Sequence, residues 1–407
     1  MMGFPRSLAA CVALLCLATS PAATAAEPSY TIRWAQIHLP SSAADRAAFE
    51  FAERVERETD GDVVVQVYSR KEYEEVAGRR RNAMQITGDV VKGELLEMTQ
   101  SYTHVLARYH QPLRVLGMPY LFRDYDHAEQ VFNGPLGAGF TDDLETSSKL
   151  KGLGITYSGG MGVISANVEA RDPSALSEMR ILISRGRYAR MAFLLGGSYV
   201  VVGPDGLVPL AREGLVDAAE TTVSCFDVYE DYKVNTVVNE THHFLLTSMV
   251  VINKAFFGTL PPEYQEIVTR VAQQIVVDER QWSIESTHES RNKLEGMGIT
   301  FHDLTQAEKD VYKAKLEPLY GMMLTPQERA LVRKVRAVGT DGTGDGLASL
   351  APEEDSVVLN APTASDAQAA DQAAPQSSGG CAATGGTRSG LAAMLLLALG
   401  LVTRRRA

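Results

Sequence analysis

Histidine is the residue type in this 407-residue chain that most readily acts in catalysis or binds a metal, and one adjacent pair stands out. His242 and His243 follow each other directly, so on a strand their rings would point to opposite faces, which is poor geometry for a shared metal ion. The sequence also lacks the HExxH zinc motif, the GxSxG nucleophile motif and a phosphate-binding loop. We therefore predict that the protein is not an enzyme and uses no cofactor or metal. An unrecognised hydrolase is the lesser alternative.

The charge balance argues against nucleic acid as a partner. The chain has a formal net charge of -11 at pH 7, whereas phosphate binding needs a basic face. The main basic run inside the body, Arg79 to Arg81, is interpreted as a solvated helix face. With 45% apolar and 22% charged residues, the chain is long enough for two or three domains with sizeable cores.

The apolar pattern along the chain predicts an α/β protein. Residues 31–37 and 63–68 are expected strands, and residues 45–58 between them carry apolar side chains at helical spacing, which makes a β-α-β opening. The second strand is almost continuously apolar, as parallel strands buried on both faces tend to be. Residues 261–296 begin with prolines and end with a glycine, which predicts one long helix or two nearly continuous ones. Further strands are expected at 154–158, 180–184, 199–202 and 248–252, with a helix at 188–195.

Three terminal segments differ from the body of the protein, which we place at residues 27–337. Residues 1–26 contain a basic residue, an apolar run and a small-residue exit, the layout of a secretory signal peptide. Residues 338–389 are rich in Ala, Ser, Asp, Gln and Pro, which predicts a disordered linker. Residues 390–407 hold a short apolar run that ends in an arginine cluster. The body is therefore expected in the periplasm or at the cell surface.

The most informative local pattern is GMPYLFRDYDHAEQVF, at residues 117–132. Pro119 lacks a backbone donor and disfavours helix in its neighbour. Asp124 to Asp126 then offer N-caps for a helix with Val131 and Phe132 on its apolar side. The pattern predicts an extended segment that turns into a helix at the acidic residues.

This segment and several others together resemble the extracytoplasmic solute receptors of TRAP transporters, of the dicarboxylate-receptor type, over residues 30–323. The others are RAAFEFAERVERETDG, ELLEMTQSYTHVL, AREGLVDAAETT and SMVVINKAFFGTLPPEYQEIV. The resemblance implies a periplasmic-binding-protein fold with two α/β lobes, hinge strands, a long helix spanning both lobes, and a solute enclosed when the lobes close.

The resemblance also implies a function and its partners. The receptor would deliver a small-molecule solute to TRAP membrane subunits. The alternative is a surface-tethered binding or interaction protein that derives from this family and is no longer coupled to transport.

The residues that hold the ligand in that family are replaced in this sequence. Gly162 and Leu182 stand at the two positions where the resemblance implies arginines. Thr221 replaces an asparagine, and Pro204 falls where an aromatic residue usually covers the ligand. Because a buried arginine without its anion is costly, the loss of both arginines predicts a ligand that has no carboxylate.

The remaining candidates are an alternative arginine and a polar and aromatic set. Arg185 or Arg187 would supply the guanidinium if the register of the strand were shifted. The polar and aromatic set at the expected cleft could hold a polyol, an amide or a cation, with tyrosine faces stacking on a quaternary ammonium. For each tyrosine, ordinary core packing is the alternative. The set is Gln36, His38, Glu75, Tyr102, Tyr157, Glu220 and Thr221.

The C-terminal segment resembles a sorting tag. As a helix, residues 391–402 would span only about 18 Å, against a hydrocarbon core of about 30 Å. With Gly380 and Cys381 before it and arginines after it, the segment is similar to glycine-glycine or myxobacterial tags, which a membrane protease cleaves. An unprocessed anchor is the alternative. The positive-inside preference keeps the arginines in the cytoplasm and the body outside.

We predict that the body is held at a membrane or cell surface through Cys381 or the apolar segment after it. A chain truncated at Ser378 should therefore move from the membrane fraction to the soluble periplasmic fraction when cells expressing the two versions are fractionated. Mass spectrometry of the C-terminus would show whether cleavage occurs near Gly380. Equal recovery of both versions in the soluble fraction would contradict the prediction.

Overall fold

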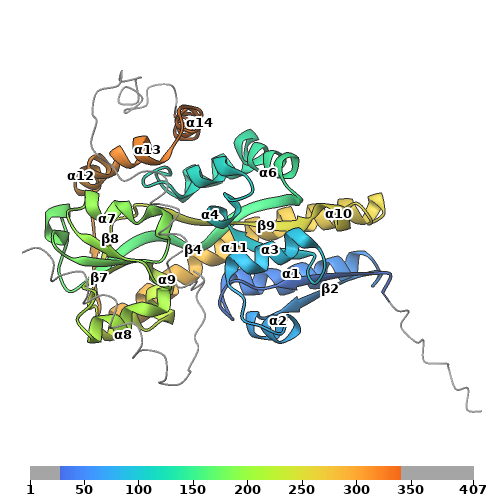
Figure 1. The fold of residues 1–407 in the computed structure, drawn as a ribbon, viewed down its shortest axis with the longest axis horizontal. Coiled ribbons are helices and arrows are strands. Elements are labelled where there is room, and N and C mark those ends of the chain that lie inside the picture. Colours follow the sequence, from blue (N-terminus) through green and yellow to red (C-terminus); the bar gives the residue numbers. More distant parts are fainter. Residues whose placement is uncertain (1–27, 341–407) are drawn as a thin grey trace, which may run out of the picture.

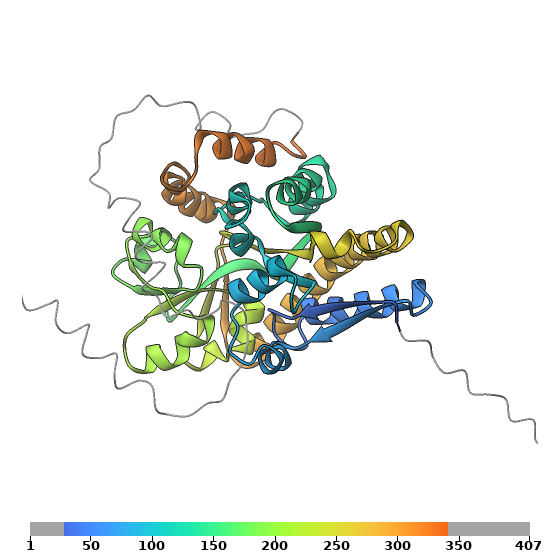
Figure 2. The ribbon, with the colours of Figure 1, turned by 45° about the vertical axis from the view of Figure 1, so that its right-hand side comes forward.

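The computed structural model describes residues 28–340. Figure 1 and Figure 2 show two lobes that share strands of one sheet and a single long helix. The predicted signal peptide, most of the predicted linker, and the C-terminal segment with Gly380 and Cys381 lie outside the described residues. Within residues 28–340, no helix is both long and apolar enough to cross a membrane.

The strands are β1 Tyr30–Ala35, β2 Val63–Tyr68, β3 Met98–Tyr102, β4 Leu150–Ala166, β5 Arg180–Ile183, β6 Ser198–Val200, β7 Ala218–Thr222, β8 Val237–Glu240, β9 Leu245–Asn253 and β10 Thr300–Asp303. Across the described residues they form one mixed sheet in the order β2-β1-β3-β9-β4-β7-β5-β6. Strand β8 joins this sheet beside β4, and β10 pairs with β8. The predicted α/β class is confirmed.

The helices cover both lobes. In Figure 1, α1 to α3 lie on one lobe, α7 to α9 lie on the other, and α12 to α14 follow the upper edge. The α-helices are α1 Ala43–Glu58, α2 Arg70–Val76, α3 Ala83–Lys92, α4 Thr103–Leu106, α5 Tyr125–Asn133, α6 Pro135–Ser147, α7 Arg190–Leu194, α8 Leu207–Arg212, α9 Val223–Val228, α10 Lys254–Phe257, α11 Pro262–Gly296, α12 Gln306–Leu316, α13 Pro318–Met323 and α14 Pro326–Arg336. The 3-10 helices are η1 Gln111–Gly117, η2 Pro173–Leu176, η3 Gly186–Tyr188, η4 Pro204–Gly206 and η5 Asp231–Lys233.

The expected β-α-β opening is present. Strands β1 and β2 pair in parallel along their whole length, and the hydroxyl of Ser42, the residue before α1, caps the first turn of that helix. Phe51 of α1 packs on Trp34 of β1, with ring centres 5.4 Å apart. The expectation that β2 is buried on both faces is wrong. Strand β2 is the edge of the sheet, and on one of its faces Val64 is only half-buried and Gln66 is exposed.

The other helices and strands expected from the sequence are present, but some differ in length from the expectation. The expected strands at 180–184, 199–202 and 248–252 are β5, β6 and β9, and the helix expected at 188–195 is η3 followed by α7. The strand expected at 154–158 is the middle of the 17-residue β4. The junction helix is α5, capped by Asp124, which accepts the His127 backbone N–H at 2.7 Å.

Strand β4 bends where it passes from one lobe to the other. Its antiparallel pairing with β9 is interrupted between Tyr157 and Met161. In this gap Gly159 and Gly160 have φ of +104° and +85°, values that side-chain-bearing residues rarely adopt. A Cβ on Gly160 would also lie 2.7 Å from the Tyr125 hydroxyl. The glycine pair therefore allows the bend between the lobes.

Helix α11 links the two lobes, as the resemblance implied. Its N-terminal half buries Val268 and Ile275 in a core that also contains Phe51 of α1. Its C-terminal half buries Leu294 in a second core, with Phe226 of α9. One 35-residue helix thus contributes to the cores of both lobes.

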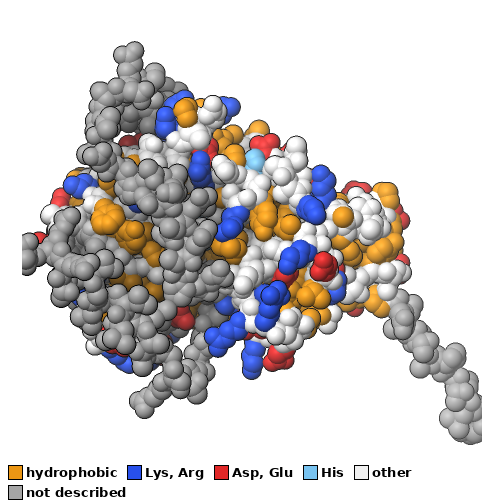
Figure 3. Space-filling view, in the orientation of Figure 1, with side chains coloured by type: hydrophobic (Ala, Val, Ile, Leu, Met, Phe, Trp, Pro, Cys, Tyr) orange, Lys and Arg blue, Asp and Glu red, His pale blue; other side chains and the backbone are white. Residues whose placement is uncertain are grey.

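The basic run at residues 79–81 is not a helix face. It lies between α2 and α3, and only Arg79 and Arg80 are exposed. Arg81 is buried, and its Nε donates to Asp89 at 2.6 Å. The interpretation of the whole run as solvated is therefore wrong for Arg81, which neutralises a buried carboxylate. In the face shown in Figure 3, basic side chains gather over the lobe that carries α2 and α3.

A buried polar contact lies where α11 crosses the central strands. Glu279 of α11 is fully buried and accepts from Gln100 Nε2 of β3 at 2.7 Å. Gln100 Nε2 also donates to Ser248 of β9 at 2.8 Å. Burial raises the pKa of Glu279 to about 8, although Gln100, Thr156 and the charge of Arg280 oppose the increase. Glu279 is therefore mainly protonated at neutral pH.

We predict that Glu279 makes the protein less stable as the pH rises. Its folded pKa of about 8 exceeds the value of about 4.3 expected in the unfolded chain. The folded state therefore binds one proton more than the unfolded chain over this range. The contribution of this proton to the free energy of unfolding is lost between about pH 4.5 and 8, at up to about 1.4 kcal/mol per pH unit. Glu279→Gln removes this pH dependence. As the pH rises from about 4.5 to 8, the free energy of unfolding of the variant should therefore increase relative to that of wild type.

Urea unfolding between pH 5 and 9 measures this difference. Glu289→Gln, at an exposed position of the same helix, is the matched control and should follow the wild-type curve. Parallel curves for wild type and Glu279→Gln would show that Glu279 does not hold a proton in the folded state.

Candidate solute-binding site

A buried ion pair between Arg185 and Glu220 is the centre of the candidate site. Arg185 follows β5, Glu220 lies on β7, and the two strands are neighbours. Arg185 Nη2 donates to Glu220 Oε1, and Nη1 donates to the Gly117 carbonyl at 3.3 Å. The rings of Phe244 and Tyr188 lie 3.6 and 4.6 Å from the guanidinium carbon. The positive charge is thus satisfied by the protein itself.

His243 completes the cluster without adding a charge. Its Nε2 lies 3.3 Å from Glu220 Oε1 and its Nδ1 lies 2.7 Å from the Thr241 hydroxyl. Burial lowers the pKa of His243 by more than Glu220 raises it, so the ring is neutral. Burial opposes ionisation of Glu220, but Arg185 and His243 outweigh it and lower the pKa of Glu220. The cluster therefore holds one positive and one negative charge.

The first predicted ligand position, Gly162, is filled by a neighbouring ring. A Cβ on Gly162 would lie 2.0 Å from Cε1 of Phe244, and Gly162 N donates to the Phe244 carbonyl at 2.7 Å. No side chain fits at position 162 while this ring stays in place. The ring that occupies the space also stacks on Arg185.

The second predicted ligand position, Leu182, belongs to a core. Leu182 is buried in a small apolar cluster with Leu207, Val216 and Ala219. Its neighbour Ile183 is in a different cluster on the other face of β5. The expectation that position 182 lines the ligand site is therefore not supported by its packing.

Of the other predicted residues of this lobe, Arg185 is part of the ion pair, and the rest are not. The register-shifted Arg185 does reach the cluster, but it arrives paired with Glu220. Thr221 is half-buried next to Glu220 on β7, and its hydroxyl donates to the Thr222 carbonyl at 3.4 Å. Arg187 lies in η3, and Pro204 begins η4.

Three predicted residues of the other lobe, Gln36, His38 and Tyr102, are buried and are together called the neutral wall below. The rings of His38 and Tyr102 have centres 4.8 Å apart, and burial lowers the pKa of His38 to about 3, so that ring is uncharged. Gln36 donates from Nε2 to the Ala44 carbonyl at 3.2 Å. These side chains follow β1 or end β3, and none of the three carries a positive charge at neutral pH.

Strand β9 relates this neutral wall to the ion pair. Tyr102 pairs with Ser248 of β9, and Phe244 lies four residues earlier along the same chain segment. At the usual rise of a strand, this separation is about 13 Å. The two groups of side chains are thus separated along the direction of β9.

Two predicted residues are not brought to the site. Tyr157 is fully buried, donates to Glu129 Oε1 at 3.0 Å, and packs on the rings of Tyr125 and Phe132. Core packing, the alternative weighed for this tyrosine, is thus its observed environment. Glu75 is exposed on α2, and no contact links it to the cluster.

Sequence reasoning missed His243, Phe244 and Tyr188 as parts of the cluster. His243 was noted only as one of two adjacent histidines, and neither Phe244 nor Tyr188 lies in a motif that signals its role. Among the described residues, no group of three or more His, Cys, Asp or Glu side chains could hold a metal ion. His242 and His243 contact different groups, and they lie between β8 and β9 rather than on a strand.

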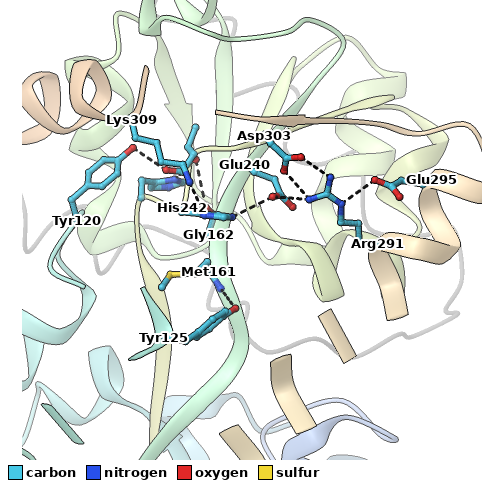
Figure 4. A network of polar contacts seen from close by, with 12 residues as sticks. Tyr120, Tyr125, Met161, Gly162, Glu240, His242, Arg291, Glu295, Asp303 and Lys309 are labelled. Atoms are coloured by element: carbon cyan, nitrogen blue, oxygen red, sulfur yellow. Dashed lines mark hydrogen bonds and ion pairs between the residues drawn. The ribbon is translucent and has the colours of Figure 1, made fainter. Parts of the chain in front are cut away.

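The segment that carries His243 and Phe244 is held from several sides, as Figure 4 shows. Glu240 Oε2 accepts from Arg291 of α11 at 3.0 Å, and the Nζ of Lys309 in α12 lies 3.0 Å from His242 Nδ1. Tyr120 Oη donates to the Thr241 carbonyl at 3.0 Å. These contacts hold His242 at a φ of +48°, which is uncommon for a residue other than glycine.

Comparison with known proteins shows to which family the chain belongs. The chain matches the family model "Bacterial extracellular solute-binding protein, family 7" over residues 35–327. The chain belongs to this family. It is 22% identical over 303 residues to a solute-binding protein of Chromohalobacter salexigens, covering 74% of this chain and 87% of that protein. It is 24% identical over 327 residues to the C4-dicarboxylate-binding periplasmic protein of Rhodobacter capsulatus, covering 78% and 93%.

Solved structures of similar fold include two TRAP periplasmic solute-binding proteins. One, from Xanthobacter autotrophicus with bound β-D-galacturonate, has a TM-score of 0.67 and 22% identity, covering 75% of this chain and 99% of that one. The other, from Ochrobactrum anthropi, has its C-terminus bound in the ligand-binding pocket, with a TM-score of 0.69, 19% identity, and coverage of 76% and 96%.

For this family 7 solute-binding protein, the comparisons confirm the predicted periplasmic-binding-protein fold and the resemblance to a family of extracytoplasmic solute receptors. Membership of a solute-binding family also confirms the prediction that the protein is not an enzyme.

We predict that Gly162→Ala destabilises the solute-binding protein by about 1–3 kcal/mol, the usual cost of overpacking a core. The new Cβ would meet the Phe244 ring at 2.0 Å. Phe244→Leu should recover most of this loss in the double variant, since it removes the clashing ring atoms. Urea unfolding of the single and double variants measures the coupling. Gly139→Ala, where a Cβ meets nothing within 4 Å, is the control and should be at least as stable as wild type, because alanine is favoured over glycine inside a helix. A Gly162→Ala variant as stable as wild type would show that the ring is not fixed there.

Proposed function

We propose that this protein binds a small polar solute without a carboxylate in the periplasm and delivers it to TRAP-type membrane subunits. The observation that carries the proposal is that the buried Arg185 is already paired with Glu220. A guanidinium that is satisfied inside the protein offers a ligand carboxylate little gain.

Charge repulsion supports the same conclusion. A carboxylate that approached Arg185 would bring a second negative charge beside Glu220 in a buried environment, and two carboxylates sharing such a site oppose each other's ionisation. The nearest imidazole, His243, is neutral. In the other lobe, Gln36, His38 and Tyr102 carry no positive charge. The cation whose charge acts on Tyr102 is Arg70 of α2, which is itself paired with Glu74.

The relatives point to solutes of similar size but do not fix the ligand. Several structures of similar fold hold glucuronate or galacturonate, but at about 20% identity they share the fold alone. The solute proposed here resembles these sugar acids in polarity and differs from them in charge.

The fold supports a receptor mechanism. Closure of two lobes around a solute shifts the population only as far as the solute binds the closed state better. The glycine pair in β4 provides a place for bending, and α11 connects the cores of both lobes. We propose that closure brings the neutral wall of one lobe towards the ion pair of the other.

We predict that D-galacturonate binds more weakly than a dissociation constant of about 1 μM, which corresponds to about 8 kcal/mol. Calorimetry with D-galactose and D-galacturonate compares two sugars that differ only in the carboxylate. Thermal-shift screening should find its hits among neutral hydroxylated or amide solutes. Tight binding of galacturonate, succinate or malate would contradict the proposal. If Arg185→Met abolished that binding, the register-shift alternative would be correct.

A further inference from the structure

We infer that Glu220 sets the class of solute by acting as a built-in carboxylate for Arg185 while presenting its second oxygen to a hydroxyl or amide group. This inference deepens the function proposed above and rests on it. Of the solutes considered from the sequence, which were polyols, amides and cations, it keeps those with a hydroxyl or primary amide group and excludes quaternary ammonium cations.

The inference is based on two atoms of the Arg185–Glu220 pair that have no hydrogen-bond partner among the described residues. Glu220 Oε1 receives Arg185 Nη2 and lies 3.3 Å from His243 Nε2. Glu220 Oε2 is buried and has no hydrogen-bond partner among the described residues, although the side chain is only 1% exposed. A buried acceptor without a donor is destabilising, so Oε2 is the atom that a solute donor would satisfy.

Arg185 has the complementary unused atom. Its Nε–H is buried and has no acceptor within the described part of the chain. A site that lacks one donor and one acceptor matches a hydroxyl or a primary amide, since each supplies both. A carboxylate cannot donate, and it would repel Glu220. A quaternary ammonium has no N–H to give.

The pair is fixed in place from separate parts of the chain. The Gly117 carbonyl accepts from Arg185 at 3.3 Å. The Tyr188 ring lies on the guanidinium, and the Tyr188 hydroxyl donates to the Arg114 carbonyl at 2.9 Å. Phe244 stacks on the guanidinium and also fills the side-chain space at Gly162. A site held in this way is preorganised, so specificity depends on its charges rather than on rearrangement.

Glu220→Gln tests the inference. The amide keeps the shape of the side chain and removes its negative charge, which frees Arg185 to pair with a carboxylate. Calorimetry with D-galacturonate and D-glucuronate should show at least a tenfold gain in affinity over wild type. Affinity for the matched neutral sugars should change less than affinity for the acids.

Two control variants separate this effect from general damage. Glu129→Gln removes another carboxylate that is paired with a buried arginine, Arg280, at 2.7 Å, and it should give no gain for sugar acids. The double variant Arg185→Met with Glu220→Gln removes both charges of the central pair, so it should lose the gain. A gain that persisted without Arg185 would overturn the inference.

A second measurement covers the case in which Glu220→Gln does not fold. Glu220→Ala removes the same carboxylate without burying an amide and leaves Arg185 for a ligand carboxylate to satisfy, so sugar acids should raise its melting temperature more than that of wild type. If neutral solutes bind wild type but neither variant gains affinity for acids, the inference is wrong and the proposed function stands. If wild type itself binds sugar acids tightly, the proposed function is wrong as well.

Discussion

The buried ion pair between Arg185 and Glu220 is the interaction on which the proposed solute site depends. A guanidinium removed from water needs an anion beside it, and this protein provides that anion from the neighbouring strand. The stacked rings and the neutral His243 are arranged around this pair. The segment between β8 and β9 is held by α11, α12 and Tyr120, so that Phe244 lies against the guanidinium.

The fold does not depend on this pair. Helix α11 and the β4–β9 strands organise the two lobes through apolar cores, through the protonated Glu279, and through ion pairs of α11 arginines with Glu129 and Glu240. The same framework can therefore carry different solute sites, because the charges proposed to select the solute are two side chains, Glu220 on β7 and Arg185 in the connection after β5. This separation explains how the chain keeps the family fold while its site departs from the ligand pattern that the resemblance implied.

Sequence patterns predicted the elements with strong periodicity and missed the polar strands. The β-α-β opening and α11 follow from apolar spacing and from the terminal prolines and glycine. Strands β3 and β7, MTQSY and AAETT, were not predicted because buried polar residues interrupt their apolar pattern. The length of β4 was underestimated because Gly159, Gly160 and Gly162 interrupt its pattern. For the site, Glu220 and Arg185 were named separately, but 35 residues separate them, and only the packing of β5 beside β7 brings them together.

Identification of the solute that co-purifies with the mature protein tests the central claim most directly. Mass spectrometry of the released solute, together with a crystal structure of the complex, would define both its chemistry and its contacts. The account predicts a neutral solute whose hydroxyl or amide group contacts Glu220, with the Arg185–Glu220 pair intact. A solute whose carboxylate is seated on Arg185, with Glu220 displaced, would contradict it.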